Sequence, residues 1–97
     1  MLDYSAMAYV YFPGGYGTLD ELFTVLTLVQ TGKSDANVPI ILMGSDYWTP
    51  LVEWLSRSLA ERHFIAPADL RLLCVTDDIE EAVQIIKSAA ERTDGGG

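Results

Sequence analysis

The residues best suited to chemistry lie together in the stretch 13–21, which reads Pro-Gly-Gly-Tyr-Gly-Thr-Leu-Asp-Glu. Its three glycines follow an apolar run typical of a buried strand, and they precede a pattern that starts a helix. Glycines in this position expose backbone N–H groups that can bind an anion, and the partial positive charge of the helix N-terminus adds to the attraction. This succession of strand, glycine-rich loop and helix start predicts a phosphate- or nucleotide-binding loop formed by Gly14, Gly15, Gly17 and Thr18.

Two readings of Glu21 follow from its spacing to Thr18. The pair has the T-x-x-E spacing of a capping box, in which Thr18 caps a helix beginning at Leu19 and Glu21 bonds back to the Thr18 amide. The same carboxylate is also suited to catalysis, although the spacing alone favours the cap. Asp20 lies about 100° around the helix from Glu21, so we expect it to be solvated rather than a second catalytic carboxylate.

The stretch 13–21 matches the PGGxGTxxE motif of the Lonely Guy family, the cytokinin riboside monophosphate phosphoribohydrolases formerly labelled lysine decarboxylases. The resemblance continues more weakly through 46–48 and 75–78 to about residue 90, so the chain is similar to the second half of a family member. It implies hydrolysis of a nucleoside 5′-monophosphate to free base and ribose 5-phosphate. It also implies that Glu21 is the catalytic residue, which stabilises charge on the ribosyl ring or activates water.

The family also relies on an arginine just before this strand and on a glycine-rich nucleotide loop near its N-terminus. We expect this chain to contain neither, because its first apolar run already begins at residue 6. Two alternatives to an active enzyme therefore stay open. One is a nucleotide- or cofactor-binding module without catalysis, and the other is a structural remnant that oligomerises; the sequence does not identify the base.

The composition of the chain limits the classes of partner and ligand that it is expected to bind. The 97 residues carry 6 basic and 14 acidic side chains, for a net charge of −8, which disfavours nucleic acid and anionic membranes as partners. Cys74 is the single cysteine, and no signal peptide or membrane-spanning run is present, so the expected location is cytoplasmic. His63 stands alone, and no cluster has metal-ligand spacing, so neither a metal nor a cofactor is expected.

The chemistry must be positioned by alternating strands and helices. Apolar runs and helical periodicity predict strands at 6–12, 38–43 and 70–75, with helices at 19–31, at 47–62 and from 77 onward. The start of the second helix is open between an Asp46 cap and a Thr49 cap followed by Pro50. This βαβαβα order predicts an α/β fold with a three-layer, Rossmann-like parallel sheet, half of the full family domain. A single domain is expected over 1–92, with a flexible tail at 93–97.

Two apolar surfaces predict self-association. The helix at 19–31 is apolar around more than half of its circumference, and the strand at 6–12 is expected to lie at a sheet edge. Exposed sheet edges and large apolar faces tend to pair with another chain. We therefore expect an obligate homo-oligomer, most simply a two-fold dimer.

Overall fold

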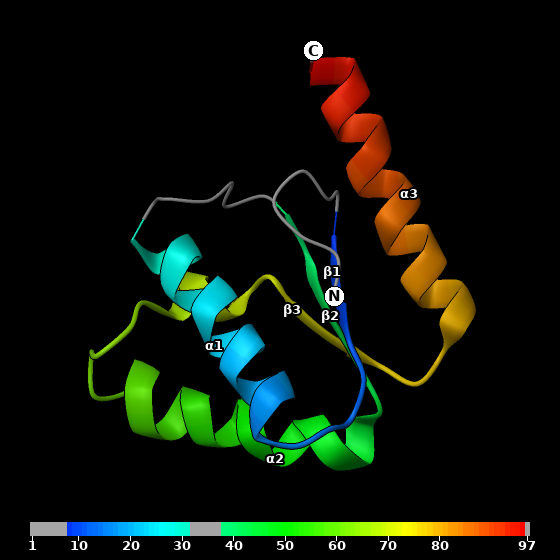
Figure 1. Ribbon diagram of the computed structural model, residues 1–97. Coiled ribbons are helices and arrows are strands. Elements are labelled where there is room, and N and C mark those ends of the chain that lie inside the picture. The colour runs from blue at the N-terminus through cyan, green and yellow to red at the C-terminus, as the bar shows by residue number, and fades with distance from the viewer. Residues whose placement is uncertain (1–7, 32–37, 97) are drawn as a thin grey trace.

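The computed structural model of the chain describes residues 8–31 and 38–96, and these form an open, parallel, three-stranded sheet (Figure 1). The strands are β1 (Tyr9–Tyr11), β2 (Ile40–Met43) and β3 (Leu73–Thr76), in the spatial order β1-β2-β3. Tyr9 pairs with Ile40, which in turn pairs with Leu73. The predicted α/β class with a parallel, Rossmann-like sheet is therefore confirmed, and residues 6 and 7 of the expected first strand lie outside the described part.

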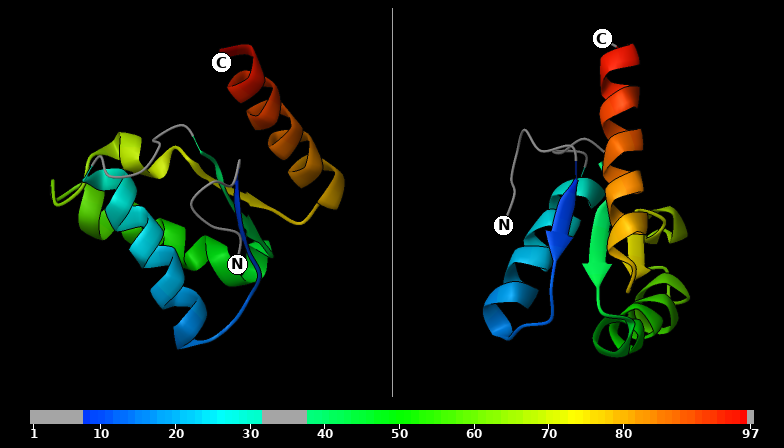
Figure 2. Two further views of the ribbon diagram at one scale, coloured as in Figure 1. Left: turned by 45° about the horizontal axis from the view of Figure 1, so that its top comes forward. Right: turned by 90° about the vertical axis from the view of Figure 1, so that its right-hand side faces the viewer.

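Helices cover both faces of this sheet, as the two views in Figure 2 show. The helical elements are α1 (Tyr16–Gln30), α2 (Ser45–Leu55), the π-helical turn η1 (Ser56–Ala60), the 3-10 turn η2 (Pro67–Leu70) and α3 (Ile79–Gly96). None of the helices in the described ranges combines the length and apolar character needed to cross a membrane. The division into a domain at 1–92 and a tail at 93–97 stays a prediction.

Alternation along the strands builds a separate core on each face. Ile40 and Leu42 face α1 and α2, where the side chains of Leu22 and Trp48 are fully buried against them. Ile41 and Met43 face the other way and pack near Ala82 of α3. Successive side chains of a strand point to opposite faces, so an uninterrupted apolar run is what a strand covered on both sides requires.

The expected start of the first helix is wrong by three residues. Helix α1 begins at Tyr16 with Gly15 as its N-cap, no side chain caps it, and the Leu19 N–H donates to the Gly15 carbonyl at 3.2 Å. Thr18 thus already lies in the first helical turn and does not form the capping box with Glu21. The reason is that Gly15 can end the loop itself, since its carbonyl accepts the first helical hydrogen bond.

The second helix also differs from expectation at both ends. It starts at Ser45 with Gly44 as N-cap, so neither Asp46 nor Thr49 has that role. Its far end passes through the π-helical turn and stops where the His63 N–H donates to the Ala60 carbonyl at 3.0 Å and the Phe64 N–H to the Leu59 carbonyl at 2.8 Å. This pair of bonds is a Schellman motif, with His63 in the left-handed region at φ 65°.

Candidate functional site

The candidate site lies where the three strands end. Parallel strands bring their carboxyl ends to one edge of a sheet, which is where ligands of open α/β sheets bind. The glycine loop follows β1, Gly44 follows β2 and Asp77 follows β3, and Figure 1 shows these three connections along the lower edge of the sheet. Segments more than thirty residues apart in the sequence meet at this edge. Hydrogen bonds join Gly14 to Tyr47 and Ser45 to Asp77.

The glycine loop is held by the segment that starts α2. The Tyr47 hydroxyl donates a hydrogen bond to the Gly14 carbonyl. Pro13 packs on Gly44, because a Cβ added to Gly44 would lie 3.1 Å from the Pro13 Cγ. Gly44 also has φ 104°, which L side chains rarely adopt. Both the backbone and the close approach of Pro13 therefore require glycine at this position.

The start of α2 is fastened in turn to the loop after β3. The Ser45 N–H and hydroxyl donate to the two carboxylate oxygens of Asp77 at 2.7 and 2.6 Å. The bond from the Ser45 hydroxyl, followed by the bond from the Ser45 N–H, holds the pKa of Asp77 below its usual range. The Gly44 N–H donates to the Thr76 carbonyl at 3.0 Å. The three connections consequently form one hydrogen-bonded edge.

The glycines of the loop occupy two different environments. A Cβ added to Gly14 would overlap the Oγ1 of Thr18 and lie 3.0 Å from its Cβ, so Gly14 is packed against the first turn of α1. A Cβ on Gly15 or Gly17 would meet nothing within 4 Å. Since no side chain caps α1, the first-turn N–H groups face the same space with no helical acceptor of their own. Packing inside the described chain thus explains glycine at 14 but not at 15 or 17.

Glu21 lies on α1 one turn beyond Gly17, with an exposed side chain. Residues four apart share a face of a helix, so Glu21 lies on the side of Gly17. The backbone carbonyl of Glu21 accepts a 3.5 Å hydrogen bond from the Tyr11 hydroxyl. Burial, assisted by the nearby charge of Glu21, raises the pKa of Tyr11 to about 12. The phenol therefore remains a hydrogen-bond donor into the alkaline range.

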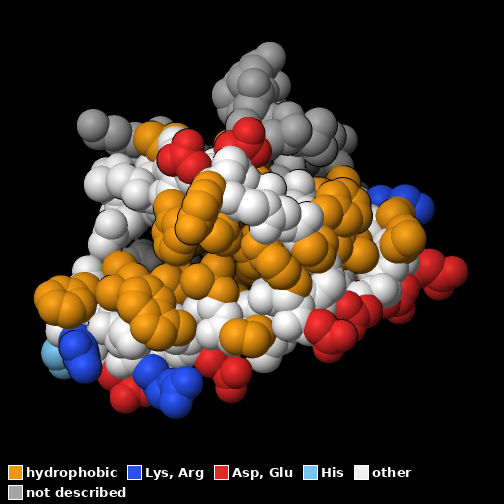
Figure 3. Space-filling view, turned by 60° about the horizontal axis from the view of Figure 1, so that its bottom comes forward, with side chains coloured by type: hydrophobic (Ala, Val, Ile, Leu, Met, Phe, Trp, Pro, Cys, Tyr) orange, Lys and Arg blue, Asp and Glu red, His pale blue; other side chains and the backbone are white. Residues whose placement is uncertain are grey.

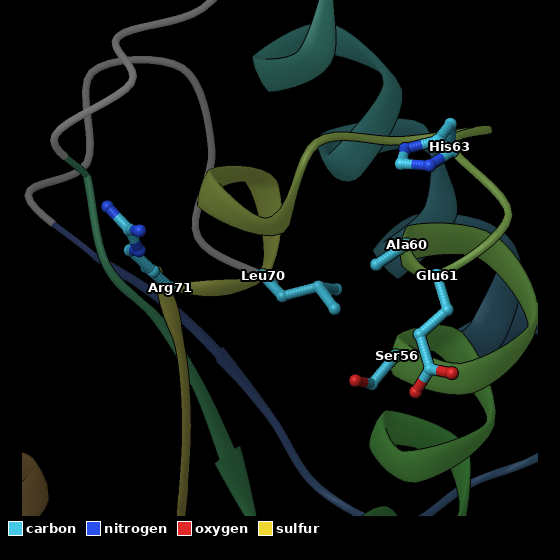
Figure 4. Close-up of a pocket in the computed structure, with 6 residues that line it drawn as sticks. All are labelled: Ser56, Ala60, Glu61, His63, Leu70 and Arg71. Carbon is cyan, nitrogen blue, oxygen red and sulfur yellow. The ribbon is translucent and has the colours of Figure 1, made fainter.

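Two cavities lie away from the glycine loop. One, of about 170 Å³, is apolar and lies between α1 and the end of α2. The other, of about 480 Å³, is lined by Ser56, Ala60, Glu61, His63, Leu70 and Arg71. In Figure 4 the Leu70 side chain points toward Ala60, whereas the Arg71 guanidinium points away from the other labelled side chains. The charged groups of this cavity do not converge, so the candidate site is the surface at the loop.

Other reactive side chains add no second site. Within residues 8–31 and 38–96, no three His, Cys, Asp or Glu side chains gather in a way that could hold a metal. Cys74 is partly buried in β3, and burial, with a smaller contribution from Glu81, raises the pKa of its thiol. A thiol with a raised pKa is a poor nucleophile at neutral pH.

Sequence reasoning missed the residues that support the loop. It placed Gly14, Gly15, Gly17 and Thr18 in one loop ahead of the helix that carries Glu21. In the structure only Gly14 and Gly15 precede α1, whereas Gly17 and Thr18 lie in its first turn and Glu21 one turn beyond Gly17; the roles of these residues stay predictions. It gave Tyr47 and Asp77, which follow the next two strands, no part in supporting the loop. Their position after predicted parallel strands was the available signal, because all such ends share an edge.

Comparison of the sequence with known proteins identifies its family. The sequence model of a family described as "Possible lysine decarboxylase" matches residues 1–86. A cytokinin riboside 5′-monophosphate phosphoribohydrolase of Rhodococcoides fascians is 37% identical over 82 residues, covering 84% of this chain and 40% of that protein. Proteins of the same name from Mycobacterium marinum and Arabidopsis thaliana are each 32% identical over 84 residues, covering 87% and 86% of this chain and 44% and 38% of theirs. The chain thus spans about two-fifths of the length of these relatives.

Proposed function

This chain belongs to the Lonely Guy family, the "Possible lysine decarboxylase" family of the matching model, and we propose that it binds the phosphate of a nucleoside 5′-monophosphate at its glycine loop. One observation carries the proposal: Gly15 and Gly17 border open space at a helix N-terminus that no side chain caps. A phosphate in that space accepts hydrogen bonds from the first-turn N–H groups and gains from the helix dipole. The hydroxyl of Thr18 is a further donor within the same turn.

The proposed reaction is hydrolysis of the bond between base and ribose, with Glu21 as the catalytic carboxylate. Glu21 lies four positions beyond Gly17, an advance of about 6 Å along the helix, so a phosphate bound at the N-terminus places the attached ribose beside Glu21. As the base departs with the bonding electron pair, positive charge develops on the ribosyl ring. The oxygen of the attacking water bonds to the ribosyl carbon that the base leaves, and the base nitrogen takes up the proton that this water loses. The Glu21 carboxylate stabilises the ring charge or accepts the water proton on its way to the base.

The test is release of free base from AMP, with binding of AMP measured in parallel. Glu21→Gln should retain AMP affinity and lower turnover by about 10²- to 10⁴-fold, the range for a catalytic acid or base. Asp20→Asn is the matched control, because it removes a neighbouring charge of the same helix. Equal turnover in wild type and Glu21→Gln would contradict the assignment.

Binding without turnover is the second candidate function. It is supported by the open space that Gly15 and Gly17 border at the uncapped N-terminus of α1, because binding there needs no contribution from the Glu21 carboxylate. In that case AMP binds in a titration and no base is released. Absence of both binding and base release would favour a structural remnant instead.

We also propose that the chain forms a homo-oligomer. Strand β1 lies at an edge of the described sheet, and Figure 3 shows apolar side chains gathered across one side of the molecule. Large apolar residues exposed in the single chain include Phe23, Leu28, Trp54 and Phe64. Sedimentation at micromolar concentration should give a dimer or larger species, and a folded, monodisperse monomer would contradict this.

A further inference from the structure

Tyr47 connects the buried core to the glycine loop. Its ring contacts the indole of Trp48 edge to face, with centroids 4.7 Å apart at 83°, and Trp48 is completely buried. The backbone N–H of Trp48 also donates to the Gly44 carbonyl at 3.0 Å, which fixes the first turn of α2. The Tyr47 hydroxyl, which donates to the Gly14 carbonyl, is therefore presented from a rigid support.

That hydrogen bond determines the direction of the next N–H group. The described chain has no cis peptide bonds, and in a trans peptide the C=O and the following N–H point in opposite directions. Because the Gly14 carbonyl faces Tyr47, the Gly15 N–H faces away from Tyr47. A Cβ at Gly15 would meet nothing within 4 Å, so open space borders this residue.

Two adjacent glycines need such support. Glycine adopts many backbone conformations of similar energy, so the peptide between Gly14 and Gly15 can rotate unless something outside the loop holds it. We propose that Tyr47 is a positioning residue of the phosphate site: its hydroxyl holds the Gly14 carbonyl and thereby turns the Gly15 N–H toward the anion. The role rests on the phosphate binding proposed above.

Ser45 and Asp77 extend the support to the third strand. Ser45 is the first residue of α2, two positions before Tyr47, and both of its polar groups donate to the Asp77 carboxylate. The loop after β3 thereby fixes where α2 starts and where the tyrosine hydroxyl lies. Asp77 acts on the glycine loop through Ser45 and Tyr47, without contacting the substrate.

The experiment compares wild type with Tyr47→Phe, which keeps the ring on Trp48 and removes only the hydroxyl. Binding of inorganic phosphate and of AMP is measured by titration, and the Gly14 carbonyl ¹³C resonance is recorded by NMR without ligand. We expect about 3- to 10-fold weaker binding of both anions, the equivalent of one ordinary hydrogen bond, and an upfield shift of the Gly14 carbonyl. Tyr9→Phe is the matched control, because it removes a hydroxyl from β1 on the same sheet face and should leave affinity unchanged.

The outcomes separate the two proposals. Unchanged affinity in Tyr47→Phe, with a wild type that binds, would overturn the positioning role and leave the proposed function intact. A wild type that binds neither anion would overturn the proposed function and the role together, even if the Gly14 resonance shifts. As a second readout, Ser45→Ala should also weaken binding, and Ser45→Thr, which keeps the hydroxyl, should restore it; a loss with both variants would contradict the part assigned to Asp77.

Discussion

Replacing Gly17 with alanine should raise stability and lower phosphate affinity at once. Gly17 is the second residue of α1, and a methyl group there would contact nothing within 4 Å. Alanine is favoured over glycine in a helix by about 0.5–1 kcal/mol. For a domain of this size that gain corresponds to an increase of about 2–8 °C in Tm.

The expected loss of affinity follows from where the methyl group points. The Cα–Cβ bond in a helix tilts toward the N-terminus, so the new methyl group of Gly17→Ala enters the space that borders the first-turn N–H groups. A phosphate displaced from one of these donors loses a charge-assisted hydrogen bond, worth about 1.5–3 kcal/mol. Affinity for AMP should therefore fall by about 10- to 100-fold.

Thermal unfolding and AMP titration on the same samples test both halves of this prediction. Thr27→Ala is the control, because Thr27 is exposed on α1 and its hydroxyl bonds to the Phe23 carbonyl at 2.8 Å, far from the loop. It should change stability alone. A lower Tm for Gly17→Ala would show that glycine at this position stabilises the fold. Unchanged affinity for AMP would show that the phosphate does not bind at the first turn of α1.

Three further predictions concern packing, backbone strain and charge. Gly14→Ala should destabilise the protein by about 1–3 kcal/mol through overlap with the Thr18 side chain. In urea unfolding, adding Thr18→Ala should recover part of that loss. Additive effects of the two substitutions on the free energy of unfolding would contradict the overlap. His63→Gly should stabilise by about 0.5–1 kcal/mol, because it relieves the left-handed φ of 65°, whereas a lower urea midpoint than wild type would refute this. The lowered pKa of Asp77 means that its bonds to Ser45 stabilise the fold above about pH 4 and are lost as the pH falls through the folded-state pKa. Ser45→Ala should therefore differ from wild type in Tm at neutral pH and converge with it in acid; a constant difference down to about pH 2 would contradict this.

Local sequence determined the second strand and the family, whereas the strand expected at 70–75 begins only at Leu73, because Leu70 belongs to the 3-10 turn η2. The run Ile40–Met43 is apolar at every position, as expected for a strand covered on both faces, and β2 is buried throughout. The stretch 13–21 was enough to predict the family that the comparisons confirm, because its glycines, threonine and glutamate are adjacent in the chain. Both features depend on neighbours within a few residues.

Helix ends were less predictable, because several residues compete to be the cap. Thr18 and Glu21 have the spacing of a capping box, yet Gly15 starts α1 three residues earlier. At α2, Gly44 starts the helix ahead of both Asp46 and Thr49. The choice depends on which carbonyl is placed to accept the first helical bond, and the neighbouring loops decide that placement.

Only the tertiary structure shows what holds the glycine loop. The Tyr47 hydroxyl meets Gly14 across 33 positions, and Ser45 meets Asp77 across 32. No spacing rule predicts such pairs, since they form only when the parallel sheet brings its strand ends to one edge. The sequence by itself thus identified the residues that we propose to bind phosphate, whereas the packing of α2 against the sheet determined which side chain reaches the Gly14 carbonyl.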